Sequence, residues 1–407
     1  MDEPRTLVIV GANLTGGAAA STLREEGFDG RVVLIGDEPH PPYERPPLSK
    51  EYLRGEKEFE ATFLRPPAWY EEAGVELRTG QRATKIDPTA RVVELEDGEP
   101  VPYDRALVST GGRNRRLSIP GHDLEGVHTL RTRGDADRIR TEAGKGRTAV
   151  VIGAGFIGSE VAASLRSLAV DVEVVEILDL PLRGVLGPEV GKVYEAIHRD
   201  HGVKFHFRET AMEFRGRDRV EEVVTQGGNR IGCDFVVVGI GISPSTDVVD
   251  ESPVAVENGI VVDEFCRTNV DGVYAAGDVA NHYHPLLGRR IRVEHWDNAL
   301  KQGATAARNM MGRQEAFTDP HWFWSDQYEF NLQCMVVASE WDEFVVRGSL
   351  EERDFLGFYV KDGAAQAVVG LNRGKEVRRS AGIIRRGGRV DPAALRDEDV
   401  DVRKLSA

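Results

Sequence analysis

Two glycine-rich turns, each lying between a predicted strand and a predicted helix, constrain the fold of this chain more than any other feature. The first follows the apolar run at residues 7–10, and the second follows the apolar run at residues 149–152. A further apolar run follows each helical pattern, at residues 32–35 and 172–175, so each turn belongs to a β-α-β unit. Units of this kind bind the pyrophosphate of a dinucleotide at the helix N-terminus. The sequence therefore predicts an α/β fold with two Rossmann-like dinucleotide-binding domains.

The similarity between the two parts of the chain extends beyond the turns. Each β-α-β unit is followed by alternating, turn-punctuated segments, at residues 82–107 and 203–238, which predict small antiparallel meanders. The segments that close them, residues 103–111 and 233–241, are alike and both end in glycine. This pattern indicates an internal repeat on the scale of a whole domain.

The last part of the chain has a different pattern, with short alternating strands closed by a basic helix near residues 376–386. It predicts a C-terminal α+β domain. We expect the first dinucleotide-binding domain to be discontinuous, at residues 1–112 and 245–320. The second is expected at residues 113–244, and the C-terminal domain at residues 321–407.

Charge, hydropathy and cysteine spacing argue against several classes of protein. The chain has 407 residues and a formal net charge of −15, which disfavours nucleic-acid binding because that needs a positive face. We see neither a signal-peptide core nor an apolar stretch long enough to span a bilayer, so we expect a cytoplasmic protein with no membrane partner.

The three cysteines, Cys233, Cys266 and Cys334, are odd in number and widely spaced. We interpret them as buried structural thiols and expect neither a disulfide framework nor a metal site.

The second glycine turn carries a complete dinucleotide-binding fingerprint. Gly153, Gly155 and Gly158 have the spacing that permits a tight turn, close approach of the backbone to a pyrophosphate, and close helix-strand packing. Glu176 ends the next strand, where a carboxylate accepts hydrogen bonds from a ribose 2′-hydroxyl and repels a 2′-phosphate. This predicts NADH rather than NADPH. The residues expected to bind NAD are Gly153, Gly155, Phe156, Ile157, Gly158, Glu176 and Gly241.

The first glycine turn departs from the ideal fingerprint. Gly11 and Gly16 are present, but Asn13 stands where the middle glycine is expected. Asparagine tolerates a left-handed backbone better than other side chains, so we expect the turn to survive with a changed phosphate contact. The acidic residue that should bind a ribose is also displaced, and Asp37 is the candidate.

Four further segments decide the family. They are residues 42–50, residues 268–278, residues 292–299 and residues 322–327. Together with the second fingerprint they resemble the FAD-dependent NADH:ferredoxin reductase family, of the putidaredoxin reductase type, in the right order along the whole chain. The resemblance implies a fold similar to glutathione reductase, in which an FAD domain is interrupted by an NAD domain and a C-terminal domain covers the flavin.

The resemblance also implies roles for individual residues. Asp278 would accept a hydrogen bond from the flavin ribityl chain, and Trp296 would pack beside the flavin ring. Lys50 would lie near the reactive flavin nitrogen, paired with Glu160, and these two are the expected catalytic residues. The FAD contacts that the resemblance and the first turn imply are Gly11, Asn13, Gly16, Asp37, Arg45, Lys50, Thr110, Gly111, Arg113, Gly277, Asp278, Glu294, His295 and Trp296.

The absence of cysteine before Cys233 excludes the thiol relay of related disulfide reductases, so electrons must leave directly from the flavin. The expected function is that of an NADH:ferredoxin or rubredoxin reductase that supplies an oxygenase or a cytochrome P450. Its partner would be a small ferredoxin or rubredoxin, and the reductase would be a monomer or a weak homodimer. Basic residues clustered at residues 289–292 and 373–386 are candidates for docking an acidic carrier.

Three alternatives remain open from the sequence. The first is a flavoprotein oxidase that hands electrons to oxygen. The second is a redox-sensing protein resembling apoptosis-inducing factor, in which NADH changes association. The third, suggested by Asn13, is a degenerate family member that has lost tight FAD binding.

Overall fold

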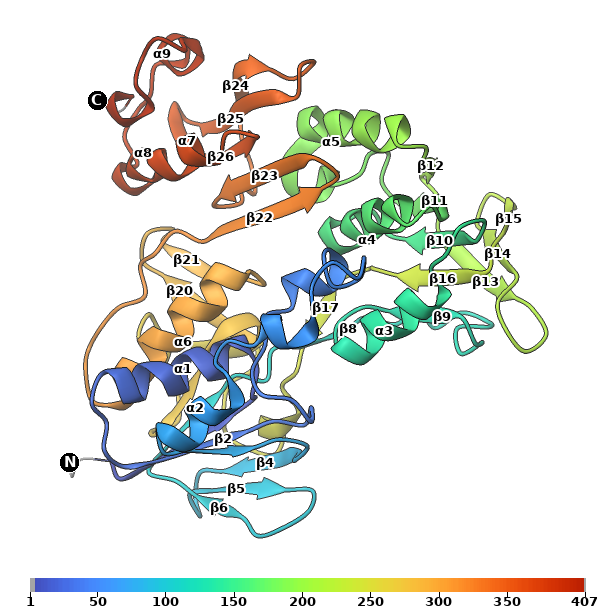
Figure 1. The fold of residues 1–407 in the computed structure, drawn as a ribbon. Helices are drawn as coiled ribbons and strands as arrows, with labels where there is room; N and C mark the ends of the chain where they lie inside the picture. The colour runs from blue at the N-terminus through green and yellow to red at the C-terminus, as the bar shows by residue number, and fades with distance from the viewer. Residues whose placement is uncertain (1–3, 406–407) are drawn as a thin grey trace. The chain divides into compact units, whose positions relative to one another are not determined.

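The computed structural model describes residues 4–405 of the chain (Figure 1). They form two compact units, each assembled from segments distant in sequence. Unit 1 comprises Met1–Glu44, Phe59–Arg113 and Ile242–His321. Unit 2 comprises Arg45–Glu58, Asn114–Gly241 and Trp322–Ala407.

Unit 1 is built on a five-stranded sheet whose neighbouring strands are all parallel. Alternate residues of its first strand face opposite sides: Leu7 and Ile9 pack with residues of helices α1 and α6, whereas Val8 and Val10 pack with a meander. Burial on both faces explains why these strands read as continuous apolar runs. In sheet order the strands are β19 (Val273–Ala275), β7 (Arg105–Val108), β1 (Thr6–Val10), β2 (Arg31–Ile35) and β3 (Val75–Arg78).

Helices α1 (Leu14–Glu25) and α6 (Trp296–Met310) lie side by side against this sheet (Figure 1). The opposite face is covered by the predicted antiparallel meander. The smaller elements of unit 1 are α2 (Pro67–Glu72), β4 (Ala83–Asp87), β5 (Val92–Leu95), β6 (Val101–Pro102), β17 (Ile242–Pro244), β18 (Ile260–Val262), β20 (Ala280–His284) and β21 (Arg289–Arg292). Strand β8 (Gly112–Asn114) ends the segment that precedes unit 2.

Unit 2 repeats the same plan in its first part. Its parallel sheet has the order β12 (Lys204–Phe207), β11 (Asp171–Glu176), β10 (Thr148–Ile152), β16 (Phe235–Val238) and β9 (Val127–Thr129). The helices are α3 (Arg133–Glu142), α4 (Phe156–Ser167) and α5 (Arg183–Asp200), and the meander is β13 (Ala211–Arg215), β14 (Glu222–Thr225) and β15 (Arg230–Gly232). In both units the first strand lies between the strand after its helix and the strand after the meander, which confirms the predicted duplication.

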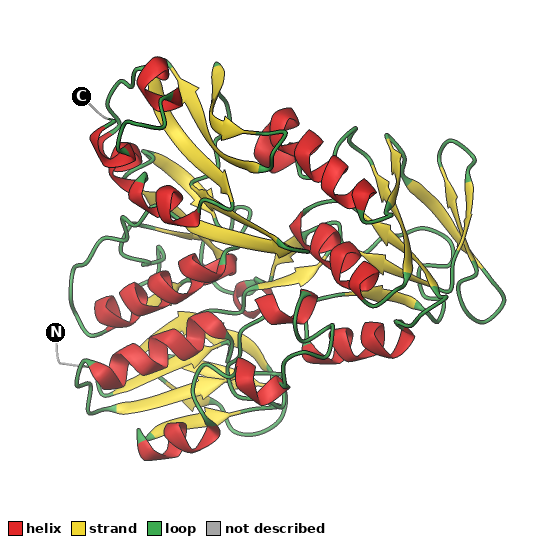
Figure 2. Cartoon of the chain, turned by 45° about the horizontal axis from the view of Figure 1, so that its top comes forward, coloured by secondary structure: helices red, strands yellow, loops and turns green. Residues whose placement is uncertain are grey.

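The C-terminal part of unit 2 is an antiparallel sheet with short helices beside it (Figure 2). The expected single basic helix near residues 376–386 is wrong in detail, because two six-residue helices meet at Ser380. In sheet order the strands are β22 (Trp322–Gln327), β23 (Phe330–Met335), β26 (Ala364–Leu371), β25 (Asp354–Lys361) and β24 (Glu343–Ser349). The helices are α7 (Gly374–Arg379), α8 (Ala381–Arg386) and α9 (Pro392–Arg396).

Within residues 4–405 no helix is both long and apolar enough to cross a membrane. The same residues contain no group of three or more side chains arranged to hold a metal ion. The three cysteines are free thiols, and burial raises the pKa of Cys233 to about 12 and the pKa values of Cys266 and Cys334 further. Cys266 and Cys334 are buried, as expected, whereas Cys233 is only partly buried.

Candidate functional site

The second glycine turn shows which glycine serves packing and which leaves room for a ligand. A Cβ on Gly153 would lie 2.6 Å from the carbonyl oxygen of Gly239, and a Cβ on Gly158 would lie 2.0 Å from that of Gly153. Gly155 differs, because its φ of −72° is ordinary and a Cβ there would meet nothing within 4 Å. Neither backbone strain nor packing requires glycine at Gly155. The open space above it fits the close approach of a pyrophosphate.

Glu176 lies beside this turn. Its side chain is buried, its Oε2 accepts a hydrogen bond from the Ala154 N–H at 2.5 Å, and its Oε1 accepts one from the Leu178 N–H at 2.8 Å. Each carboxylate oxygen has a second lone pair left for a ribose hydroxyl. Ile177 and Leu178 are 68% and 41% exposed, which is unusual for large apolar side chains and suits contact with an adenine ring. These residues fit the adenosine half of a dinucleotide.

The remaining NAD candidates surround the same turn. Gly241 has a φ of +91° and open space above it, and Ile157 is 45% exposed. Phe156 opens helix α4 and makes an edge-to-face contact with Phe323 of β22, with ring centroids 5.0 Å apart. Gly241 and Ile157 are exposed, and Phe156 is partly exposed.

The first glycine turn is closed by a side chain rather than left open. Asn13 has a φ of −117° and ψ of −166°, so the predicted left-handed backbone is wrong. Instead its Oδ1 accepts hydrogen bonds from the N–H groups of Thr15, at 3.0 Å, and Gly16, at 3.3 Å. Its Nδ2 donates to the carbonyl oxygen of Ser109 at 2.5 Å. Asn13 therefore caps helix α1 and ties the turn to the end of β7.

The register of the two sheets explains why the ribose acid is displaced in unit 1. Ile35 pairs with Val10, as Val175 pairs with Ile152, so Gly36 is the counterpart of Glu176. A Cβ on Gly36 would lie only 2.4 Å from that of Ala12. No side chain fits at that position.

Two acidic residues follow Gly36, and they differ in exposure and in hydrogen bonding. Asp37 is exposed, whereas Glu38 accepts a hydrogen bond from the Tyr43 hydroxyl at 2.6 Å. Asp37 is therefore the accessible carboxylate at the end of β2.

A buried polar group with unmet hydrogen-bonding capacity lies beside the first turn. Gly277, with a φ of +79°, donates its N–H to Oε1 of Gln302 at 2.7 Å, and a Cβ on it would meet the Thr15 hydroxyl at 2.3 Å. Nε2 of Gln302 and Oδ1 of Asn298 are buried and have no protein partner among the described residues. Such orphaned groups fit a polar ligand beside Asp278. The residues of unit 1 are thus compatible with FAD. Sequence reasoning missed Gln302 and included Asn298 only within the segment 292–299, because the contacts of both side chains depend on the packing of helix α6.

The entrance to helix α6 holds the predicted residues Glu294, His295 and Trp296. His295 is the N-cap residue, and burial lowers its pKa to about 4, so it is neutral at pH 7. Trp296 donates its ring N–H to Oε1 of Glu44 at 3.2 Å, and Glu294 pairs with Arg292 at 2.6 Å.

The other predicted FAD residues have protein partners. Thr110 donates its hydroxyl to the carbonyl of Ser245 at 2.5 Å, and the adjoining Gly111 has a φ of +69°. Arg113 forms two hydrogen bonds to Asp247, at 2.6 and 2.8 Å. Arg45, in unit 2, donates to the carbonyl of Arg131 at 2.5 Å.

Lys50 and Glu160 meet in unit 2, with Nζ 2.6 Å from Oε2 and only 5% and 4% of the two side chains exposed. The Ser49 hydroxyl also donates to Oε2 at 2.6 Å, and the Ser325 hydroxyl donates to Oε1 at 2.7 Å. Sequence reasoning predicted the pair but missed the two serines. Ser325 lies 165 positions from Glu160, so no local pattern links them.

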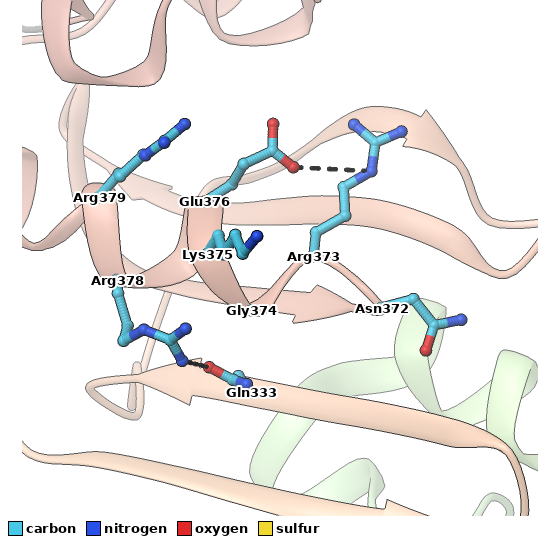
Figure 3. A pocket seen from close by; sticks show the side chains of 8 residues that line it. All are labelled: Gln333, Asn372, Arg373, Gly374, Lys375, Glu376, Arg378 and Arg379. Atoms are coloured by element: carbon cyan, nitrogen blue, oxygen red, sulfur yellow. Dashed lines mark hydrogen bonds and ion pairs between the residues drawn. The ribbon is translucent and has the colours of Figure 1, made fainter.

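A cationic cavity of about 540 Å³ lies on the C-terminal part of unit 2 (Figure 3). Arg373 is paired with acidic side chains, including Asp354, and Arg378 donates to Gln333 at 2.8 Å. The residues that line the cavity are Gln333, Asn372, Arg373, Gly374, Lys375, Glu376, Arg378 and Arg379.

Comparison with known proteins agrees with this geometry. The family described as pyridine nucleotide-disulphide oxidoreductase matches residues 5–303, and the reductase C-terminal family matches residues 322–406. The chain is 38% identical to the ferredoxin reductase subunit of 5,5'-dehydrodivanillate O-demethylase from Sphingobium sp., over 98% of each chain. It is 34% identical to putidaredoxin reductase CamA from Pseudomonas putida, over 100% of this chain and 98% of that one.

Solved structures give the same result. In the crystal structure of the covalent putidaredoxin reductase-putidaredoxin complex, the matching chain is 34% identical, with a TM-score of 0.94 over 99% of this chain and 98% of that one. The ferredoxin reductase for the CYP199A2 system from Rhodopseudomonas palustris is 33% identical, with a TM-score of 0.95 over 99% and 100%. The resemblance seen in the sequence is confirmed. The chain belongs to the pyridine nucleotide-disulphide oxidoreductase family, as an oxidoreductase of the ferredoxin reductase type that uses FAD and a nicotinamide nucleotide.

Proposed function

We propose that this protein oxidises NADH and passes single electrons to a [2Fe-2S] ferredoxin or a rubredoxin that supplies an oxygenase or a cytochrome P450. Relatives named as ferredoxin reductase components and rhodocoxin reductase support this reaction. The observation that carries it is the pairing of an open glycine at Gly155 with the buried carboxylate of Glu176, which suits an unphosphorylated ribose. Bound FAD supplies the conversion of a two-electron hydride donor into single electrons.

The residues of the chain divide into binding and electrostatic roles. The segment at residues 113–244 is proposed as the NAD domain, and residues 1–112 with 245–320 as the FAD domain. Asp278 and the entrance to α6 are proposed to bind FAD. Lys50, held by Glu160, is proposed to supply a positive charge that favours reduction of the flavin. Because no cysteine precedes Cys233, electrons have no thiol route despite the family's name.

The cavity of Figure 3 is the proposed docking area for an acidic carrier. Lys375, Arg378 and Arg379 are exposed there, in a chain with a net charge of −15. Arg290 is a weaker candidate than the sequence suggested, because its guanidinium donates to the carbonyls of Val262 and Asn281. We therefore expect K375E/R379E to raise the KM for the carrier several-fold and to spare NADH-ferricyanide activity. Unchanged carrier kinetics would contradict this assignment.

Anaerobic stopped-flow absorbance tests the reaction itself. Mixing the purified protein with NADH should bleach the flavin band rapidly, whereas NADPH should bleach it slowly. A colourless protein, or a flavin that neither nucleotide reduces, would overturn the proposal. We also propose that the protein is cytoplasmic and that it is a monomer or a weak homodimer.

Two alternatives have their own measurements. Fast oxygen uptake without a carrier would identify an oxidase. The chain is also 33% identical to human apoptosis-inducing factor 3, over 97% of this chain and 65% of that one. Slow flavin reduction combined with NADH-dependent dimerisation would favour a redox-sensing role.

A further inference from the structure

We propose that Asp179 is a second determinant of nucleotide specificity, which excludes NADPH by neutralising the two arginines that could otherwise bind its 2′-phosphate. The inference rests on the proposed nicotinamide nucleotide site and deepens it. Glu176 disfavours the phosphate by repulsion. Asp179 removes the positive charge that would offset this repulsion.

The loop after β11 is anchored at one end to the Glu176 side chain and at the other end to the glycine turn. The N–H of Leu178 donates to Glu176, and the N–H of Leu182 donates to the carbonyl of Ala154 at 2.9 Å. Asp179 lies between these two anchors. It is therefore in the segment that borders the ribose site defined by Glu176.

The end of β12 brings a second basic residue to the same loop. Glu176 is in register with Phe207, and the N–H of Arg208 donates to the carbonyl of Leu178 at 3.0 Å. Arg208 has a φ of +57°, a left-handed backbone that an arginine rarely adopts. Its guanidinium reaches Asp179, with Nη2 3.2 Å from Oδ2.

Arg183, the first residue of α5, pairs with the other oxygen of the same carboxylate, Oδ1. One carboxylate thus holds two guanidinium groups. The side chain of Asp179 is 30% exposed, and those of Arg183 and Arg208 are 41% and 78% exposed. All three are accessible to a nucleotide.

The charges explain the expected selectivity. A 2′-phosphate carries close to two negative charges, and arginine is the residue best suited to bind it. Here both arginines are paired with Asp179, and Glu176 adds a second carboxylate to the same segment, so the two positive and two negative charges offer a phosphate no net attraction. Replacing Asp179 with asparagine keeps the shape and frees both arginines.

The test uses the FAD-loaded protein and titrates it with 2′,5′-ADP and with 5′-AMP by calorimetry. D179N should raise affinity for 2′,5′-ADP about tenfold, the effect of about one charge-assisted hydrogen bond, and change affinity for 5′-AMP less than about twofold. D179N/R208Q should lose most of the gain. The matched control is D171N, at the far end of β11, where Asp171 pairs with Arg166 at 2.8 Å and where neither ligand should be affected.

The outcomes separate the inference from the proposed function. An unchanged ratio of the two affinities in D179N, or an equal rise for both ligands, would overturn the role of Asp179. R183Q/R208Q tests the same idea with Asp179 intact, and a large loss of 2′,5′-ADP binding in it would contradict the neutralisation. A parent protein that binds neither 5′-AMP nor NADH would instead overturn the nucleotide site itself.

Discussion

Lys50 Nζ and Glu160 Oε2 lie 2.6 Å apart in a place where at most 5% of either side chain is exposed. Two serine hydroxyls complete the hydrogen bonding of the carboxylate. A buried ion pair of this kind adds little net stability, but removing one partner leaves an uncompensated charge. This balance agrees with the role proposed above, in which Lys50 supplies a fixed positive charge.

We expect K50M and E160Q each to reduce the free energy of unfolding by about 3–5 kcal/mol, because each leaves one buried charge without its partner. The double variant K50M/E160Q should recover part of this loss. Urea unfolding of the three proteins measures the effect. Additive losses in the double variant would show that the two charges do not depend on each other.

Two of the three glycines of the second fingerprint, Gly155 and Gly158, should separate folding from binding. G155A adds a methyl group in open space at an ordinary φ, so the unfolding free energy should change by less than about 0.5 kcal/mol while NADH affinity falls. G158A places a Cβ 2.0 Å from the carbonyl of Gly153 and should destabilise the domain strongly. Thermal melting measures the change in stability of each variant, and nucleotide titration measures its NADH affinity. Unimpaired NADH binding in G155A would contradict the pyrophosphate assignment.

Asn13 should act as a helix cap whose loss is measurable. N13A removes the acceptor for two N–H groups of helix α1 and should cost about 1 kcal/mol of stability. N13D keeps the acceptor but loses the donor to Ser109, and should place a repulsive charge near a bound pyrophosphate. The melting temperature of the apoprotein measures the stability lost with the helix cap. Quenching of flavin fluorescence measures FAD affinity. Tight FAD binding by N13D would show that no phosphate lies there.

A buried histidine cluster in unit 1 should make the protein sensitive to acid. Burial lowers the pKa of His282 and of His321 to about 3 and that of His295 to about 4, and it also lowers the pKa of His284. The unfolded chain binds protons near pH 6.5, so stability is complete above that pH and falls as pH drops toward the folded-state values. At pH 5, each histidine whose folded-state pKa lies well below 5 should lower the free energy of unfolding by about 2 kcal/mol.

Urea midpoints between pH 7.5 and 5 measure this loss. H282N should make the pH dependence shallower, because one depressed titration is removed. The matched control is H122N, since His122 is exposed. Equal slopes for the two variants would contradict the role of the cluster.

Local patterns were sufficient for the elements and their order. Apolar runs, the glycine turns and the repeated meanders depend on neighbours within a few residues, so the two β-α-β units could be predicted. The backbone of Asn13 could not, because its conformation depends on the carbonyl of Ser109, 96 positions away. For the same reason the single helix expected near residues 376–386 became α7 and α8, which pack separately on the C-terminal sheet.

The sequence by itself determined the duplicated dinucleotide-binding plan, the position of Glu176 at the end of the strand after the second fingerprint, and the absence of a cysteine before Cys233. Only the tertiary structure decided which groups complete each site: Ser325 on Glu160, Gln302 on Gly277, and Asp179 between Arg183 and Arg208. Spacing along the chain sets the period of a strand or helix and the shape of a turn. Hydrogen bonds and ion pairs between distant segments exist only once sheet register and helix packing have fixed the distances between them.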